Sequence, residues 1–287
     1  MMLNYRLLAL SVDGAILKDN SRLSRTTKEA IEFVRNKGVY VTLVTHRSYQ
    51  QANKIAKALR MEHEMICYGG SLIAGRADKP LYAQRMPVEM ARDITFELER
   101  FGCQIIVEHE NFELTNRLHQ PQNLLGRMTV SVSESLFYPQ TVVEHISDHI
   151  DLHRIAPLRM KVDFDRNEEK EAAIEHLRSI IPGLNIVEQE GDIPSVHLKL
   201  NEANKSETLL YLGLELGIHP EEMVAVAAKE EDEEMLNAVG LGVAMGQSSL
   251  QLRKSADWVT RSNDQDGLAY MIKEVFRKQM NVSKQHL

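Results

Sequence analysis

The sequence has few of the features that mark secreted, membrane-bound or nucleic-acid-binding proteins. Of 287 residues only two are cysteines, Cys67 and Cys103, without C-x-x-C spacing, so neither a disulfide framework nor a thiolate metal site is indicated. The apolar run near the N-terminus is too short for a signal-peptide core or a membrane span. The formal net charge of -7, with no long block of one sign, argues against a nucleic-acid or anionic-membrane surface. We therefore expect a cytoplasmic protein whose partners are small molecules or other proteins; the oligomeric state is left open.

Glycine-rich phosphate loops and internal repeats are also absent. Neither G-x-G-x-x-G nor G-x-x-x-x-G-K-[ST] occurs, so a nucleotide cradled by such a loop is not expected. What the chain has is a 43% hydrophobic composition, enough to fill the core of one large domain or two ordinary ones.

The first part of the chain has the pattern of a β-α-β unit. Residues 6–10 form a short apolar run typical of a buried strand, and a helix is expected to follow with Ser24 as its N-cap. Phe33 is expected on the inner face of that helix, together with Ile31 and Val34. A second strand is expected at residues 39–44, parallel and adjacent to the first.

The alternation of strands and helices changes character near residue 85, which predicts an inserted domain. We expect a core domain made of residues 1–84 and 193–287, and an inserted α/β domain at residues 85–192. The insertion's expected elements are helices at 88–101, 140–152 and 168–180, and strands at 104–108 and 158–164. The core is expected to resume with strands at 196–200, 223–227 and 242–244 and helices at 205–216 and 233–238. The fold class is therefore α/β, with a Rossmann-like doubly wound parallel-sheet core.

In an open parallel sheet, ligands lie beyond the carboxyl ends of the strands, so the residues that follow each strand are where chemistry is expected. These residues are 11–15, 45–47, 69–71 and 227–232.

These segments carry motifs in a specific order: LLALSVDGAIL, VTHR, YGGSLI, NKSETL, VAVAAKEEDEEML and GVAMGQSSLQLRKSADWVTRSNDQDGLA. In this order and spacing the sequence resembles the Cof-type branch of the haloacid dehalogenase (HAD) phosphatases, from Leu7 to Ile272. The resemblance implies a class IIB-like fold with an inserted cap domain that selects the substrate. It also implies an aspartate nucleophile, an aspartate acid/base, a Thr and a Lys that hold the phosphoryl group, and an acidic motif that completes a Mg²⁺ site.

Matched residue by residue, the resemblance places Ser11 at the nucleophile position and Asp13 at the acid/base position. It places Thr45 and Lys205 at the phosphate-binding positions, and His46 beside Thr45 adds positive potential. The metal position that is usually Asp is Ala228. The remaining metal donors would be the Asp13 backbone carbonyl, Glu231 and Asp232, and with two carboxylates missing we expect weak Mg²⁺ binding or none.

Three functions follow from this pattern. The first is a catalytically impaired phosphatase-like protein that retains binding of phosphate or a phosphorylated metabolite, because losing two negative charges lowers the repulsion of a phosphate ester. The second is an active Mg²⁺-dependent phosphatase on small phosphorylated metabolites such as sugar phosphates. The third is a structural or protein-interaction role in which the pocket is vestigial. The residues at positions 11 and 228 favour the first function.

Two further patterns allow both a metal and an ordinary structural interpretation. The acidic run at residues 229–234 could bind a metal, but acidic residues in the first turn of a helix usually complement its dipole. His145, His149 and His153 are spaced for one helical face and could bind zinc, although no H-E-x-x-H motif accompanies them and packing roles are the commoner interpretation.

Overall fold

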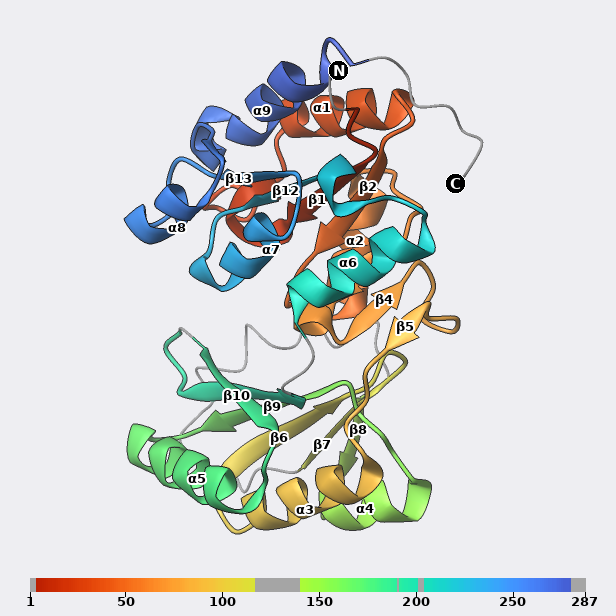
Figure 1. The fold of residues 1–287 in the computed structure, drawn as a ribbon. Helices are drawn as coiled ribbons and strands as arrows, with labels where there is room; N and C mark the ends of the chain where they lie inside the picture. The colour runs from red at the N-terminus through yellow and green to blue at the C-terminus, as the bar shows by residue number, and fades with distance from the viewer. Residues whose placement is uncertain (1–3, 117–139, 190, 201–203, 280–287) are drawn as a thin grey trace. The chain divides into compact units, whose positions relative to one another are not determined.

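The computed structural model describes residues 4–116, 140–189, 191–200 and 204–279. The chain forms two compact units, one made of Met1–Tyr82 with Asn204–Leu287 and the other of Ala83–Ala203 (Figure 1). Among the described residues, no helix has both the length and the apolar composition that crossing a membrane requires.

The first unit is built on an eight-stranded sheet in the order β14-β13-β12-β1-β2-β3-β4-β5. Its strands are β1 (Leu7–Ser11), β2 (Tyr40–Val44), β3 (Met65–Cys67), β4 (Leu72–Ala74), β5 (Tyr82–Ala83), β12 (Met223–Ala227), β13 (Leu241–Ala244) and β14 (Trp258–Val259). The six strands from β14 to β3 are parallel, and β4 pairs antiparallel with β3. Every residue of β1 is buried, as expected of a central strand with helices on both faces.

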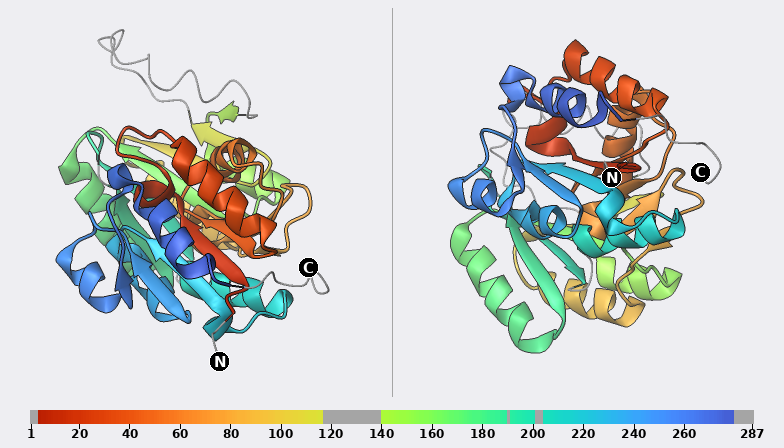
Figure 2. Two further views of the ribbon diagram at one scale, coloured as in Figure 1. Left: turned by 90° about the horizontal axis from the view of Figure 1, so that it is seen from above. Right: turned by 45° about the horizontal axis from the view of Figure 1, so that its top comes forward.

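Helices cover both faces of this sheet. They are α1 (Arg25–Asn36), α2 (Tyr49–Ala58), α6 (Lys205–Glu215), α7 (Glu233–Asn237), α8 (Leu250–Ser255) and α9 (Gly267–Phe276). Apolar side chains of α6, α7 and α8 pack in one core cluster with Leu7 and Ala9 of β1. Helices α1 and α9 lie side by side on the opposite face (Figures 1 and 2). The expected doubly wound α/β fold is confirmed.

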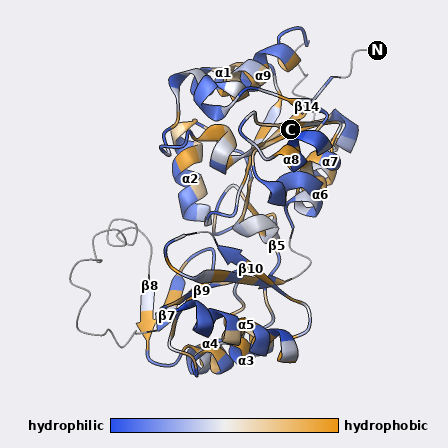
Figure 3. Ribbon diagram, turned by 90° about the vertical axis from the view of Figure 1, so that its left-hand side faces the viewer, coloured by the Kyte–Doolittle hydropathy of each residue, from blue (hydrophilic) through white to orange (hydrophobic). Residues whose placement is uncertain are grey.

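The second unit is a six-stranded sheet in the order β10-β11-β9-β6-β7-β8 with helices on one face. Its strands are β6 (Cys103–Glu108), β7 (Glu113–Asn116), β8 (Gln140–Val143), β9 (Arg159–Phe164), β10 (Leu184–Gln189) and β11 (Ser195–Leu200), and its helices are α3 (Val88–Leu98), α4 (Ile146–His153) and α5 (Asn167–Ile180). One apolar cluster joins the three helices to the sheet. In Figure 3 these helices alternate between hydrophobic and hydrophilic residues, as helices with one buried face do.

Two of the local signals that we identified in the first unit have the expected structure, and one does not. The Ser24 hydroxyl accepts a hydrogen bond from the backbone N–H of Thr27 at 3.0 Å, which confirms Ser24 as an N-cap. Strands β1 and β2 are parallel neighbours, with Leu10 opposite Leu43. The placement of Phe33 on the inner face is wrong, because it is 37% exposed while Ile31 is fully buried. Phe33 is two residues from Ile31, and at 100° per residue this turns it away from the core.

Two expectations at the edges of the insertion are also wrong. Residues 196–200 do not return to the first sheet, because β11 pairs antiparallel with β10 and β9 in the second unit. The sequence pattern of a half-buried strand does not indicate which of two sheets the strand joins. The segment 140–152 is not one helix: it begins with β8, paired to β7, and α4 starts only at Ile146. The β-branched residues Thr141 to Val143 suit a strand better than a helix.

Candidate functional site

Within the first unit, three neighbouring strands bring the predicted site residues to one edge of the sheet. Strands β12, β1 and β2 are adjacent and parallel, so their carboxyl ends meet at the same edge. Ser11 ends β1, Thr45 follows β2, and Ala228 follows β12. Lys205 begins α6 and is also part of this group, because it contacts the residues that follow β12.

A buried carboxylate, Asp232, is at the centre of the site. Its Oδ2 accepts a hydrogen bond from Ser11 Oγ at 2.9 Å, and its Oδ1 accepts one from Lys205 Nζ at 2.6 Å. The side chain of Asp232 is completely buried and that of Lys205 is 6% exposed. A buried charge is tolerated when it is paired and hydrogen-bonded, and both oxygens of Asp232 meet this condition.

Glu231 connects this carboxylate to the segment after β2. Its Oε1 accepts a hydrogen bond from Lys205 Nζ at 3.0 Å and lies 3.1 Å from His46 Nε2. Burial alone would raise the pKa of the Glu231 carboxyl. The hydrogen bond with His46 and the charge of Lys205 outweigh burial and hold this pKa well below its ordinary value of 4.5. Glu231 therefore contributes to stability as an anion.

This lowered pKa predicts how replacing Glu231 will change stability with pH. We expect Glu231→Gln to lower the free energy of unfolding by about 1 kcal/mol at pH 7, a modest value because the side chain is 38% exposed. A group whose folded pKa is lowered stabilises above its unfolded pKa, and this contribution fades as pH falls below about 4.5. The difference between native protein and variant should therefore shrink with acidification. Urea denaturation at several pH values, followed by the fluorescence of the single tryptophan, Trp258 in the first unit, measures it.

Glu29→Gln is the matched control for this experiment, because Glu29 forms an exposed pair with Arg25 in the same unit. It should change stability by only a few tenths of a kcal/mol. A difference between native protein and Glu231→Gln that stays constant from pH 7 to about pH 3.5 would contradict the charge-based explanation.

Asp13, at the acid/base position, is held by an arginine. Arg47 donates to its carboxylate from Nε, at 3.1 Å, and from Nη2, at 2.7 Å, which is the bidentate geometry of a strong ion pair. The backbone N–H of Arg47 in turn donates to Thr45 Oγ1 at 3.1 Å. Thr45 is 2% exposed. Arg47 thus couples the acid/base position to a predicted phosphate-binding position.

The loop after β1 lies directly against position 228. Gly14 has a φ of +83°, and a Cβ placed on it would come within 2.7 Å of the Ala228 Cβ, so glycine is required there. Gln247 fixes this loop, since its Nε2 donates to the Gly14 carbonyl at 2.6 Å while its Oε1 accepts from the backbone N–H of Asn263 at 3.0 Å. The loop after β1 is therefore held closely against position 228, where the resemblance leads one to expect a carboxylate.

The donor set does not fit a magnesium ion. Position 228 offers no side-chain oxygen, Asp232 is bound by Ser11 and Lys205, and Glu231 by Lys205 and His46. Within the described ranges, no three His, Cys, Asp or Glu side chains are grouped so that they could hold a metal ion. Mg²⁺ prefers six oxygen ligands in a near-octahedral arrangement. The same finding argues against a metal site in the acidic run at residues 229–234 and against a three-histidine zinc site, since His145 precedes α4 as its N-cap.

The structure thus brings Ser11, His46, Lys205, Glu231 and Asp232 into one hydrogen-bonded network. It links Asp13 and Thr45 through Arg47, which lies in the segment 45–47 where chemistry is expected but to which we assign no role from the sequence. Gln247 was missed as well. The signals for Arg47 are its place after the second strand and its two predicted phosphate-binding neighbours, and the signal for Gln247 is its place in the motif that begins GVAMGQ.

Fold and site together define the class of this protein. A doubly wound parallel sheet carries polar residues at the carboxyl ends of its central strands, joined by Lys205 from the start of α6, which is where an open α/β protein binds its ligand. The sequence model of the haloacid dehalogenase-like hydrolases matches residues 8–272. The chain belongs to this family.

Three comparisons give the sequence or structural similarity between this chain and known proteins. The chain is 34% identical over 277 residues to the stress response protein YhaX of Bacillus subtilis, covering 96% of this chain and 95% of that protein. It is 23% identical over 270 residues to the 5-amino-6-(5-phospho-D-ribitylamino)uracil phosphatase YcsE of the same organism, covering 94% and 95%. The crystal structure of a haloacid dehalogenase-like hydrolase from Bacteroides thetaiotaomicron has the same fold, with a TM-score of 0.80 at 21% identity, covering 95% of this chain and 100% of that one.

Proposed function

We propose that this protein binds a small phosphorylated molecule without a divalent ion and hydrolyses it slowly or not at all. The binding site is the edge of the first unit's sheet that carries Asp13, Thr45 and Asp232. One observation carries the proposal. Each carboxylate that the site retains, Asp13, Glu231 and Asp232, is bound by a basic side chain of the protein. The basic side chains of the protein thus balance these negative charges, as a metal ion would otherwise do.

Hydrolysis is expected to be slow because the group at the nucleophile position is a serine with no base in place. Ser11 Oγ donates a hydrogen bond to Asp232 Oδ2, but the charge of that carboxylate is already balanced by Lys205 at Oδ1, which makes it a weak base. Asp13 is held by Arg47. A hydroxyl needs an adjacent base to attack phosphorus, and proton transfer alone contributes only about 10²- to 10⁴-fold.

Phosphate binding is expected because cations and donors converge on this edge. Arg47 contacts Asp13, His46 contacts Glu231, Lys205 contacts Glu231 and Asp232, and Thr45 adds a hydroxyl. Carboxylates at positions 11 and 228 would add two negative charges, and their absence lowers the repulsion of a phosphate group. A phosphate can replace the Glu231 or Asp13 carboxylate as a partner of these cations.

The second candidate function is an active Mg²⁺-dependent phosphatase that hydrolyses small phosphorylated metabolites such as sugar phosphates. It is favoured by the phosphatase name of the YcsE relative. It requires Glu231, Asp232 and the Asp13 backbone carbonyl to bind the ion with water as additional ligands, and Lys205 would have to release both carboxylates.

Calorimetric titration with inorganic phosphate and with glucose 6-phosphate distinguishes the two functions. We expect the affinity for either probe to be the same in Mg²⁺ and in EDTA, within about twofold. Thr45→Val should weaken binding about tenfold, since a hydrogen bond to a charged group is worth roughly 1.5 kcal/mol or more. Thr42→Val is the matched control, because Thr42 is a buried threonine of β2 that donates to the Glu64 carbonyl instead.

Turnover of glucose 6-phosphate that requires Mg²⁺ would establish the second function. Absence of saturable binding of both probes, with the fold of the protein intact, would reject both functions at this site.

A further inference from the structure

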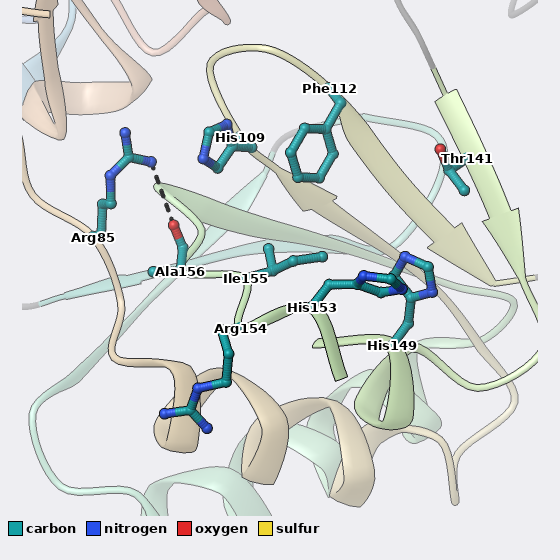
Figure 4. A pocket seen from close by; sticks show the side chains of 9 residues that line it. All are labelled: Arg85, His109, Phe112, Thr141, His149, His153, Arg154, Ile155 and Ala156. Carbon is teal, nitrogen blue, oxygen red and sulfur yellow. Dashed lines mark hydrogen bonds between the residues drawn. The ribbon is translucent and has the colours of Figure 1, made fainter. Parts of the chain in front are cut away.

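A pocket of about 610 Å³ lies within the second unit, between the turn that joins β6 to β7 and the end of α4 (Figure 4). All of its lining residues belong to that unit, so it shares none with the site around Asp232. Its volume is in the range of small-molecule sites. The proposed function assigns no role to it.

Aromatic rings form two sides of this pocket. The rings of His109 and Phe112 are stacked almost in parallel, with centroids 4.7 Å apart and planes at 11°. The rings of His149 and His153 lie near each other with centroids 4.3 Å apart and planes at 45°, so this pair is tilted and not stacked. Figure 4 shows the first ring pair on one side of the pocket and the second, with Ile155, on the other. A flat ring that enters the pocket can therefore continue the stack of His109 and Phe112.

Burial lowers the pKa of His109 and of His149. Both rings are therefore uncharged at neutral pH and bring no charge into the pocket.

The polar groups of the lining are mostly donors. Of the nine lining residues, all within the described part of the chain, two are arginines, three are histidines and none is Asp or Glu. Glu110 lies behind the lining with a side chain only 4% exposed; it pairs with Arg85 and its Oε2 lies 3.1 Å from His109 Nδ1. Arg85 also donates to the Ala156 carbonyl at 3.4 Å. These contacts fix the donor side chains in advance, which lowers the entropic cost of binding.

We propose that this pocket binds a planar heterocycle with carbonyl acceptors on its edge, as in a uracil ring. The stacked rings of His109 and Phe112 recognise the flat face of such a molecule, and arginine N–H groups recognise its carbonyl oxygens. A rigid, neutral ring loses little conformational entropy on binding. The guanidinium charges of Arg85 and Arg154 are balanced by Glu110 and Glu89, so a net charge on the ligand is not required.

Uridine and dihydrouridine test this proposal on the full chain, by isothermal titration or saturation-transfer NMR. The two probes have the same carbonyl acceptors, but dihydrouridine has lost its flat aromatic ring. We expect saturable binding of uridine and at least tenfold weaker binding of dihydrouridine. Phe112→Leu should weaken uridine binding about tenfold, the usual size of a base–aromatic stacking contribution. Phe96→Leu, which changes a 59% exposed phenylalanine of α3 outside the pocket, should have no effect.

Several results would overturn the assignment. Equal affinity for the two probes, or unchanged affinity in Phe112→Leu, would show that stacking in this pocket does not hold the ring. Loss of uridine binding in Thr45→Val would place the ring at the first unit's site instead. Uridine that does not bind up to about 10 mM would show that the pocket has no such ligand. None of these results depends on whether the first unit binds phosphate.

Discussion

Replacing Ser11 and Ala228 together by aspartate is expected to create Mg²⁺-dependent hydrolysis of 4-nitrophenyl phosphate, at a rate roughly a thousandfold above that of the native protein. Position 11 ends β1 and position 228 follows β12, its parallel neighbour in the sheet. Two carboxylates there would supply a nucleophile and the missing oxygen donors for a divalent ion. The estimate is conservative, because removing a catalytic nucleophile typically costs about 10⁴- to 10⁶-fold.

The same double variant should make stability depend on magnesium. An aspartate at position 11 would lie beside the buried Asp232, which now accepts a hydrogen bond from the Ser11 hydroxyl. Like charges at this distance repel, so the double variant should melt at a lower temperature than the native protein in EDTA and recover in Mg²⁺. The melting temperature of the native protein should not respond to Mg²⁺.

Ser11→Asn with Ala228→Asn is the control, since asparagine has the size of aspartate without its charge. It should show neither turnover nor a magnesium-dependent melting temperature. If the native protein and the aspartate variant hydrolyse the ester at equal rates, the residues at positions 11 and 228 do not limit activity and the proposal of impaired catalysis fails.

Most of the first unit's fold could be predicted from local patterns. The strand at Met223–Ala227 was predicted with these bounds, because a five-residue apolar run between polar segments has few alternatives in an α/β chain. The two-residue strands β5 and β14 were missed, because two residues carry no periodicity. Strand β11 was predicted as a strand but assigned to the wrong sheet, since its partners β9 and β10 are selected by tertiary packing.

The site was predictable as a set of positions but not as a set of contacts. Ser11, Thr45 and Ala228 follow adjacent strands, and topology alone brings such residues together. The partners of the carboxylates were not predictable, because they depend on the directions of long side chains. The guanidinium of Arg47 reaches Asp13, which is 34 residues away in sequence, and nothing in VTHR indicates that direction.

The second large effect is expected from Lys205→Met, which should destabilise the first unit by about 3–5 kcal/mol. The substitution keeps an unbranched side chain of similar length but removes the ammonium group that Asp232 Oδ1 contacts at 2.6 Å. The Asp232 side chain is fully buried, so its charge would be left without a cation in a medium that solvates it poorly. Urea denaturation followed by Trp258 fluorescence measures the loss, because this tryptophan reports on the first unit.

Two further variants separate the cost of an unpaired buried charge from a general cost of mutation. Lys18→Met removes an ammonium whose partner, Asp266, is 35% exposed, and it should cost less than about 1 kcal/mol. Adding Asp232→Asn to Lys205→Met should restore most of the loss, because the amide is neutral and its oxygen still accepts from Ser11. A loss below about 1 kcal/mol in Lys205→Met would contradict the assignment of a buried charge pair. A large loss that Asp232→Asn reverses would show that Lys205 stabilises the fold by balancing the charge of Asp232. Any contribution of Lys205 to phosphate binding must then be measured in the double variant, whose fold is stable.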